Sequence, residues 1–293
     1  MGTVSHKNAP SHSGLSQSLW GNFPFQNTQR TVGSGGGPMA RFIMEDYMGF
    51  GKSTAVSSNL GRYASRAGCY QSWEDTGGSI ANLPTLTGGG IRLTNDTTDN
   101  DEVNMQLGDI TGVLGALSVT AGKAGCVPTW YETRVRFPTQ VASGDCFVGL
   151  AEEGVGVTDF FGDSDTFADK DYIGFYTVAG APTTLKFAYH KAGGTEVSFT
   201  AATIAVDTWY KLGFLFIPPG FSGYGYQYDA NKLIRVFVDN AEYTTSYITK
   251  TQGDSTTHFP GDEEMSPMMS VKNSTTVARA MDSSFWAWGQ LIQ

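Results

Sequence analysis

The chain has 293 residues, 19 basic and 28 acidic side chains, and therefore a net charge of −9 and a pI of about 4.9. Because 40% of its residues are apolar and 13% are aromatic, it can build a core, which excludes the disordered class of protein. The acidic balance argues against a nucleic-acid partner, and no apolar run approaches the ~20 residues of a membrane helix, so no membrane partner is expected.

The first 40 residues differ in composition from the rest, so we expect an extended N-terminal arm or linker over 1–40. Polar residues are frequent here, and the glycine-rich run that ends at Pro38 would form a flexible exit. Three aromatic side chains nevertheless lie in this polar segment, at Trp20, Phe23 and Phe25. Since aromatic residues dominate binding hot spots, they either anchor the arm on a partner or fold back on the chain's own domain.

Short apolar or alternating runs, broken by turn residues, fill residues 41–293, which we expect to form one domain. At 129–137 the alternation places Tyr131, Val135 and Phe137 on one face and Glu132 on the other, as in a half-buried strand. Apolar runs at 146–150 and 234–238 predict strands covered on both faces. Further strands are expected at 41–48, 90–94, 103–107, 172–178, 185–191, 196–200, 209–216, 243–248, 268–271 and 285–292.

No window of twelve residues has the 3.6-residue period of a helix, and no repeat of 20–50 residues is present. Many short strands without helical crossovers predict an all-β fold, a sandwich of two antiparallel sheets. The cysteines, Cys69, Cys126 and Cys146, are an odd number without CxxC spacing, so buried free thiols are expected. Cys126 and Cys146 flank one predicted strand and are the pair that a hairpin would bring together.

Seven phrases follow one another along residues 40–293: FIMEDY at 42–47, GGIRLT at 89–94, NDEVNMQL at 100–107, WYETRVRF at 130–137, FVGLAE at 147–152, DTWYKLG at 207–213 and VFVDN at 236–240. Each is a degenerate strand pattern, so the information lies in their order and spacing. This succession resembles the concanavalin A-like jelly rolls, of the laminin G or lectin/glucanase type, in virion proteins of tailed bacteriophages. The resemblance implies a jelly-roll β-sandwich on a phage particle, as a head decoration, head fibre or tail-associated protein.

Signatures of catalysis are missing from the sequence. Glycosidases with this kind of fold carry Glu-x-Asp-x-x-Glu on one strand, because alternation then places all three carboxylates in the cleft. No glutamate between Glu45 and Glu264 is followed by aspartate two positions later, and no Gln-x-His pair of similar lyases occurs. We expect no catalytic residues and no enzyme; a hydrolase hypothesis would have to use Glu152 or Glu153. The four histidines are scattered, at His6, His12, His190 and His258.

Two acidic stretches keep a metal hypothesis open. Asp96, Asp99 and Asp101 crowd one loop, five aspartates between 159 and 171 crowd another, and calcium takes such oxygen ligands. Neither stretch has the glycine that an EF-hand loop needs, so we favour acidic surface loops and predict no metal site. Neither glycine-rich stretch, at 33–37 or 51–53, has the context of a phosphate loop, so no cofactor is expected.

An aromatic, glycine-rich segment at 218–228 carries Phe221, Tyr224, Tyr226 and Tyr228. This composition is compatible with three roles: a platform for a sugar, a contact with a neighbouring subunit, or a cover for an open end of its own sandwich. The sequence leaves these alternatives open.

Together these observations predict a non-enzymatic phage virion structural protein, a capsid decoration protein attached through its N-terminal arm and subunit contacts. Its partners would be the major capsid protein and sister subunits in a homo-oligomer, for example a trimer. It would be made in the host cytoplasm and reside on the capsid surface of the virion. The alternative is a carbohydrate-binding fibre or tail module that recognises a glycan.

Overall fold

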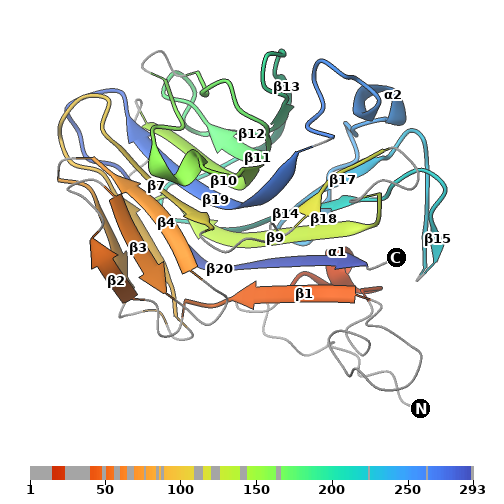
Figure 1. Ribbon diagram of the computed structural model, residues 1–293, viewed down its shortest axis with the longest axis horizontal. Coiled ribbons are helices and arrows are strands. Elements are labelled where there is room, and N and C mark those ends of the chain that lie inside the picture. Colours follow the sequence, from red (N-terminus) through yellow and green to blue (C-terminus); the bar gives the residue numbers. More distant parts are fainter. Residues whose placement is uncertain are drawn as a thin grey trace.

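Two large antiparallel sheets pack face to face in the computed structural model, which describes residues 15–23, 40–47, 51–55, 60–64, 69–75, 77–83, 86, 89–108, 115–119, 126–138, 144–162, 166–223, 225–261 and 263–291 (Figure 1). Helical structure in this part is limited to α1 (Gln17–Trp20), η2 (Val155–Val157) and α2 (Lys250–Gly253). The chain therefore folds as the predicted all-β jelly-roll sandwich.

One layer is an eight-stranded sheet. Seven of its strands form a continuous path, and the eighth, β1 (Ala40–Glu45), pairs with β20. The path runs through β18 (Ala241–Glu242), β17 (Ile234–Val238), β14 (Trp209–Phe216), β9 (Thr129–Arg136), β20 (Ala280–Leu291), β6 (Ile91–Thr94) and β5 (Ser79–Asn82).

The other layer is a ten-stranded sheet that bends, so that its outer face is concave (Figure 1). Its path runs through β13 (Val197–Thr203), β12 (Thr184–His190), β11 (Tyr172–Thr177), β10 (Gly144–Glu152), β19 (Glu264–Asn273), β7 (Glu102–Leu107), β4 (Cys69–Glu74), β3 (Leu60–Ala64) and β2 (Gly51–Ala55). Beside this path, β8 (Gly115–Ala116) pairs with β19, and β15 (Ser222–Gly223) and β16 (Tyr226–Gln227) form a separate hairpin.

The core lies between the sheets and follows the alternation of the strands. Tyr131 and Val135 of β9 point inward, as predicted, and Tyr131 stacks on Phe214 of β14 with ring centroids 5.4 Å apart. Phe175 and Phe187 come from the ten-stranded sheet to meet them. Burying one such side chain stabilises the fold by about 1.5–3 kcal/mol, so this interface dominates the stability of the sandwich.

Strand β10 has a second apolar layer on its outer side. Val148 and Leu150 face the core between the sheets, whereas Phe147 and Ala151 face an outer cluster with Phe160. This burial on both faces is the reason for the continuous apolar run at 146–150, and the prediction from that run is confirmed.

Several sequence predictions differ from the structure. Strands β2, β3, β4 and β5 were not expected, because glycine, serine and charged residues interrupt their alternation. The strand expected at 243–248 is wrong: β18 ends at Glu242, and beyond it only Ile248 forms an isolated bridge, to Ile234. The turn before β18 uses Asp239 and Asn240 in left-handed conformations, with φ of 47° and 68°, as a tight hairpin requires.

An irregularity between Ser283 and Phe285 changes which residues of β20 face outward. Before it, Asp282 lies on the outer face and Met281 in the core; after it, Phe285 lies on the outer face and Trp286 in the core. One extra residue in a strand shifts its alternation by one position. The same strand therefore offers a carboxylate at one end of the outer face and apolar residues at the other.

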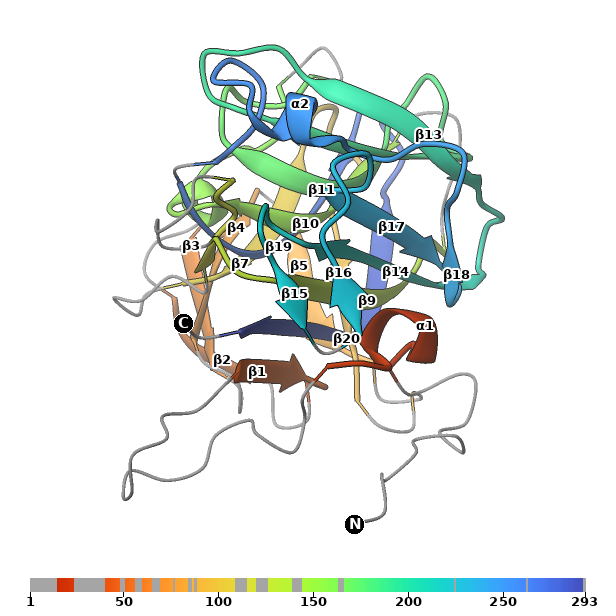
Figure 2. The same cartoon turned by 90° about the vertical axis from the view of Figure 1, so that its right-hand side faces the viewer.

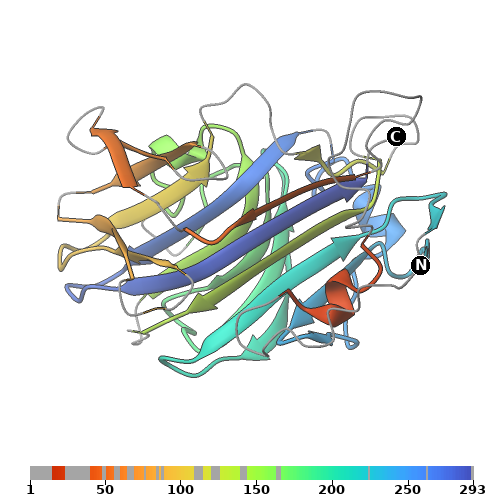
Figure 3. The same cartoon turned by 90° about the horizontal axis from the view of Figure 1, so that it is seen from below.

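The N-terminal arm is not extended away from the domain where the structure describes it. Residues 15–23 lie on the outer face of the eight-stranded sheet, with α1 next to β14 and β18 (Figure 3). Leu19, Trp20 and Phe23 are 0–5% exposed and belong to an apolar cluster with Trp130 and Phe285. A short helix forms here because the outer face of the sheet buries one side of the turn.

Glycines on the sheet make room for this arm. A Cβ atom at Gly213 would lie 2.5 Å from Cδ2 of Leu19, and one at Gly289 would lie 2.5 Å from Cε2 of Phe23. Both distances are shorter than real contacts allow, so any larger residue at these two positions would displace the arm.

Cys69, Cys126 and Cys146 are all free thiols, and Cys69 is exposed where a buried thiol was expected. None of the helices in the described residues is long and apolar enough to cross a membrane.

Candidate functional site

A segment of the chain itself covers the middle of the concave face. It runs from Glu153 to Asp171 between β10 and β11, and within it the structure describes 153–162 and 166–171. We call it the covering loop. Phe160 and Phe161, 0–1% exposed, pack on Phe147 and Tyr172 beneath them. In this region the covering loop therefore occupies the surface of the sheet.

Polar side chains of β7 and β19 hold the covering loop through its backbone. The carboxylate of Glu102 accepts hydrogen bonds from the backbone N–H groups of Phe160 and Phe161, at 2.9–3.0 Å, and from the hydroxyl of Ser270 at 2.5 Å. Lys272 donates from Nζ to the carbonyl of Phe161 at 3.0 Å. Burial raises the pKa of Glu102 to about 7, although these donors oppose the shift.

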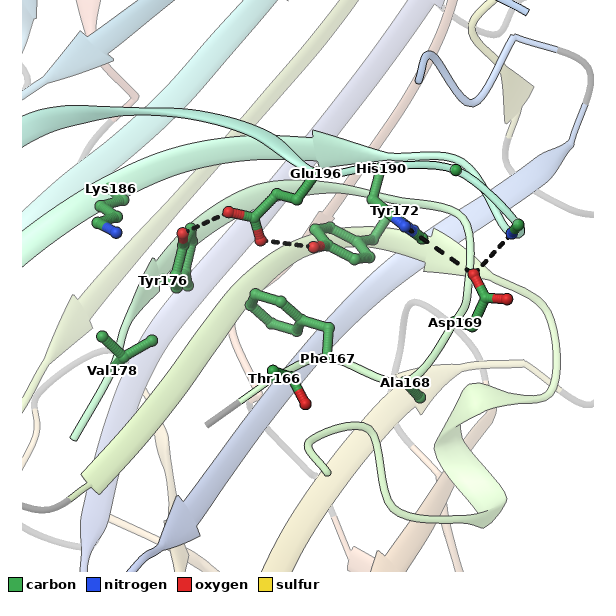
Figure 4. Close-up of a pocket in the computed structure, with 12 residues that line it drawn as sticks. Thr166, Phe167, Ala168, Asp169, Tyr172, Tyr176, Val178, Lys186, His190 and Glu196 are labelled. Carbon is green, nitrogen blue, oxygen red and sulfur yellow. Dashed lines mark hydrogen bonds and ion pairs between the residues drawn. The ribbon is translucent and has the colours of Figure 1, made fainter. Parts of the chain in front are cut away.

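Beside the covering loop, the concave face remains open as a hollow of about 670 Å³ (Figure 4). Its floor comes from β11 and β12, and its walls come from the covering loop and from the turn that leads into β13. The lining residues are Thr166, Phe167, Ala168, Asp169, Tyr172, Tyr176, Val178, Lys186, His190, Gly193, Gly194 and Glu196.

The register of β11 and β12 arranges the floor of this hollow. Tyr172 lies opposite His190, and the two rings stack with centroids 5.3 Å apart. Tyr176 lies opposite Lys186, whose Nζ is 5.6 Å from the ring centroid. Since both pairs are on the outer face, they present aromatic surface next to the imidazole of His190 and the ammonium group of Lys186.

Glu196 ties the two tyrosines together. The hydroxyl of Tyr172 donates to Oε2 at 2.7 Å, and the hydroxyl of Tyr176 donates to Oε1 at 2.6 Å (Figure 4). Burial, together with the charge and hydrogen bond of Glu196, raises the pKa of both tyrosines, so both remain protonated donors at neutral pH. The rings are therefore held in fixed positions before any ligand arrives.

His190 and Asp169 form the other end of the hollow. Nδ1 of His190 lies 2.7 Å from the carbonyl of Lys170, which only accepts, so Nδ1 carries the proton. Nε2 faces Oδ1 of Asp169 at 3.9 Å, and Asp169 also accepts from the backbone N–H of Gly193 at 2.6 Å. This end offers the carboxylate of Asp169, which accepts hydrogen bonds, next to the imidazole ring of His190.

These groups suit binding better than bond cleavage. A glycosidase needs one carboxyl group that is protonated to serve as the acid and a second one that is ionised. In the hollow, Glu196 accepts from two hydroxyls and Asp169 accepts from a backbone N–H, so neither is held as an acid. The carboxylate of Glu152 lies outside the lining and pairs with Lys170 at 2.8 Å, and Glu153 is exposed.

The aromatic residues predicted to bind a partner lie elsewhere. Trp20 and Phe23 are buried against the chain's own sheet, which is the arrangement that the sequence left open as the alternative to partner binding. Nε1 of Trp20 donates to Glu132 at 2.8 Å, so even its polar atom is engaged within the chain. Phe25 lies outside the described residues.

The predicted aromatic loop is also separate from the hollow. Tyr226 is buried with the arm and donates from its hydroxyl to the carbonyl of Leu19 at 2.9 Å, and the hairpin of β15 and β16 lies beside α1 (Figure 2). Phe221 and Tyr228 pack at the edges of the apolar clusters. Tyr224 lies outside the described residues. The loop therefore covers the chain's own sandwich around the arm.

The residues of the hollow were not predicted, because the apolar alternation of β11 and β12 indicates only which side of each strand faces the core. The available signal was that Tyr172 and Tyr176 alternate with Ile173 and Phe175, which makes both faces of one strand aromatic. A strand with a solvated outer face would carry polar residues there.

In the part of the acidic stretches that the structure describes, no group of three or more histidine, cysteine, aspartate or glutamate side chains is arranged to hold a metal ion. Asp96 and Asp101 do interact: burial and the neighbouring Asp96 raise the pKa of Asp101 to about 7, while the hydrogen bond with Asp101 lowers that of Asp96. Asp163 and Asp165 lie outside the described residues.

No protein-family model and no curated protein matches the chain. Among solved structures, a protein of unknown function from Shewanella oneidensis MR-1 is similar over 97% of each chain, with 11% identity and a TM-score of 0.49. Peanut lectin is similar over 87% of this chain and 99% of its own, with 10% identity and a TM-score of 0.48. The carbohydrate recognition domain of Emp47p covers 82% and 92%, with 11% identity and a TM-score of 0.45. At this identity no function transfers, so the function must follow from the residues of the site.

Proposed function

We propose that the chain is a non-enzymatic carbohydrate-binding module, and that the hollow between the covering loop and β13 holds one or two sugar units of a glycan. The observation that carries this proposal is the tyrosine pair that Glu196 fixes on the floor of an open hollow. Ligand sites combine an apolar lining with a few well-placed polar groups, and their volumes of about 300–1,000 Å³ include this one.

A sugar ring matches this lining because its two kinds of surface match two kinds of residue. Its C–H face is apolar and packs on aromatic rings, which Tyr172, Tyr176 and Phe167 supply. Its hydroxyl edge needs donors and acceptors, which Lys186, Glu196 and Asp169 supply. Neutral hydroxyl groups can donate to Glu196 and Asp169, whereas an anionic ligand would be repelled by both.

A glycan array followed by calorimetry tests the proposal. Wild-type protein should bind a set of neutral glycans, and Glu196→Gln should weaken binding about tenfold, because hydrogen bonds to a charged acceptor contribute most. The matched control is Glu153→Gln, which removes an exposed carboxylate from the covering loop outside the hollow. No glycan above background, or an equal loss in both variants, would reject the proposal. Release of reducing sugars would instead show an enzyme.

We propose, second, that this module acts on a phage virion, as the resemblance in the sequence implies. The buried placement of Trp20 and Phe23 changes how attachment to a capsid would work, because those aromatics already occupy a site on their own domain. Attachment would then use residues 1–14, the segment 24–39 or the surface of the sandwich. Mass spectrometry and immunogold labelling of purified particles test this location: absence of the protein from particles would reject it.

A further inference from the structure

Among the described residues, the arm covers one half of the outer face of the eight-stranded sheet and leaves the other half open (Figure 3). The arm covers the half around Trp130 and Leu215. On the open half, register places Arg134 and Arg136 of β9 on the same face as Arg92 of β6 and Lys211 of β14. Four cationic side chains thus gather on one surface of a chain whose net charge is −9.

A buried carboxylate fixes two of these arginines. Asp282 is 0% exposed and accepts from Nε of Arg92 at 2.6 Å and from Nη2 of Arg136 at 2.6 Å. The two guanidinium groups lie above it, with 37% and 25% of their side chains exposed. The acid is therefore beneath the surface and the positive charge faces solvent, although Asp207 pairs with Arg136 at the rim.

Arg134 differs from its neighbours because, among the described residues, no carboxylate forms an ion pair with it. Its guanidinium lies over the ring of Trp209, 4.4 Å from the centroid, and donates only to the hydroxyl of Ser284 at 3.4 Å. Burial and the charge of Arg136 lower the pKa of Arg134, which reflects how closely the positive charges are placed. Most of its donors are thus available, and the ring holds them in position.

The arm contributes to this surface by occupying the nearest acid. Glu132 lies on the same face, two residues from Arg134 along β9, and its carboxylate accepts from the backbone N–H of Ser16 at 2.9 Å and from Nε1 of Trp20 at 2.8 Å. With its acceptors filled by the arm and its carboxylate buried, Glu132 is withdrawn from solvent. Of the remaining acids nearby, Asp239 accepts from the backbone N–H of Lys211 at the end of the sheet.

We propose that this surface is a second binding site, for an anionic polysaccharide whose sulfate or carboxylate groups pair with Arg134, Arg92 and Arg136. Arg92 and Arg136 converge on Asp282, so their guanidinium groups lie closer together than the ~10 Å that separates their strands, and Arg134 is about 7 Å from Arg136 along β9. Anionic groups on successive or alternate sugars of an extended chain recur over such distances. The site lies on the sheet opposite the neutral-sugar hollow and does not depend on that proposal.

The same observations disfavour two other kinds of partner, a nucleic acid and a folded protein. A nucleic acid binds by neutralising many phosphates, commonly 6–10, whereas the open half of this face has four cations and the net charge of the chain is negative. A folded protein partner needs an interface with an apolar centre that is depleted of charge, and here the centre consists of guanidinium groups around Asp282. A flexible polysaccharide with regularly spaced anionic groups needs neither many cations nor an apolar centre in its binding surface.

Affinity electrophoresis of the full chain with dextran sulfate, polygalacturonate and neutral dextran tests this proposal. Both anionic polymers should retard wild-type protein at low salt, neutral dextran should not, and retardation should disappear at about 1 M salt, where the Debye length is about 3 Å. Arg134→Gln should weaken binding to the anionic polymers about tenfold. Because Arg134 forms no ion pair with a carboxylate among the described residues, this variant leaves no buried charge unpaired. The midpoint of its thermal unfolding shows whether it is folded.

The matched control is Lys232→Gln, which removes an equal charge from another cation that lies on an aromatic ring, Tyr247 at 4.6 Å, away from this face. It should keep wild-type affinity within a factor of two. Equal loss in both variants, no retardation by either anionic polymer, or equally tight binding of duplex DNA would each overturn the proposal. Glu196→Gln should leave dextran sulfate binding unchanged. The proposal for the neutral-sugar hollow can therefore fail without affecting the proposal for the anionic site.

Discussion

The two outer faces of the sandwich are each covered by another segment of the chain, and on each face a buried glutamate accepts the donors of that segment. On the concave face Glu102 binds the covering loop, and on the opposite face Glu132 binds the arm. The covering loop connects directly to a strand at both ends. Between the arm and the next strand, β1, the sequence has residues 24–39.

The difference lies in what each cover leaves open. Next to the covering loop, the concave face presents aromatic rings with two acidic acceptors, which suit a neutral ligand rich in hydroxyl groups. Next to the arm, the other face presents guanidinium groups over a buried acid, which suit an anionic ligand. One fold thus separates two surface chemistries by placing a sheet pair between them, and a variant can alter one surface without the other.

The largest expected effect comes from breaking the apolar contact of the arm. Trp20→Ala removes a buried ring from the cluster around Trp130, and we expect it to lower the free energy of unfolding by about 3–5 kcal/mol. Trp209→Ala, on the open half of the same face, should cost only about 1 kcal/mol, the value of its cation–π contacts. Urea denaturation measures both values. Equal losses would show that the arm contributes no more than a surface side chain.

A second effect depends on pH and concerns the covering loop. Glu102 has a folded-state pKa of about 7, above its ordinary value of 4.5, so the folded state binds a proton more tightly than the unfolded chain. Its contribution to stability is complete below about pH 4.5 and is lost as the pH rises through about 7; over this range the loss is about 3 kcal/mol.

Denaturation of wild type and Glu102→Gln between pH 4.5 and 8 checks this dependence. The variant cannot titrate at this position, so the stability of wild type relative to the variant should fall as the pH rises. Subtracting the variant removes the contribution of Asp101, whose pKa is also raised to about 7. A difference that is constant with pH would mean that Glu102 is ionised throughout and that its donors outweigh its burial.

The smallest effect tests the shape of the sheet under the arm. Gly289→Ala would place a methyl group against Phe23, and we expect a loss of about 1–3 kcal/mol with faster proteolysis of residues 15–23. In Gly180→Ala the new methyl group meets nothing within 4 Å, so its effect should stay within about 0.5 kcal/mol. Unchanged proteolysis of the arm in Gly289→Ala would show that the glycine is not needed for docking.

The fold was predictable where one face of a strand is apolar over its whole length. Alternation placed β9 and β14 within one residue of their observed bounds, and the apolar run of β17 matched Ile234–Val238. The short strands β2 and β3, at one end of the ten-stranded sheet, gave no such signal, because Gly51, Gly61 and Arg62 interrupt any alternation of apolar residues. The length of β19 and β20 was underestimated, since Pro267 and the irregularity at Ser283 interrupt their patterns.

The candidate site was less predictable than the fold because its residues are brought together by register and not by sequence spacing. Tyr172 and His190 are eighteen positions apart and stack only because β11 and β12 pair at that point. Likewise Asp282 meets Arg92 and Arg136 only through the order of β6, β20 and β9. Aromatic residues in the polar arm were recognised as exceptional, but composition alone does not distinguish docking on the chain's own sheet from docking on another molecule.

The extra residue near Ser284 in β20 has a consequence for how this chain can diverge. If the strand instead kept strict alternation through Ser284, Trp286 and Trp288 would turn from the core to the outer face, while Phe285 and Ala287 would enter the core. The position of the arm, the carboxylate under the arginines and the tryptophans of the core are therefore inherited together. Homologues of this chain should therefore keep this irregularity, or lose it only together with one residue of the strand.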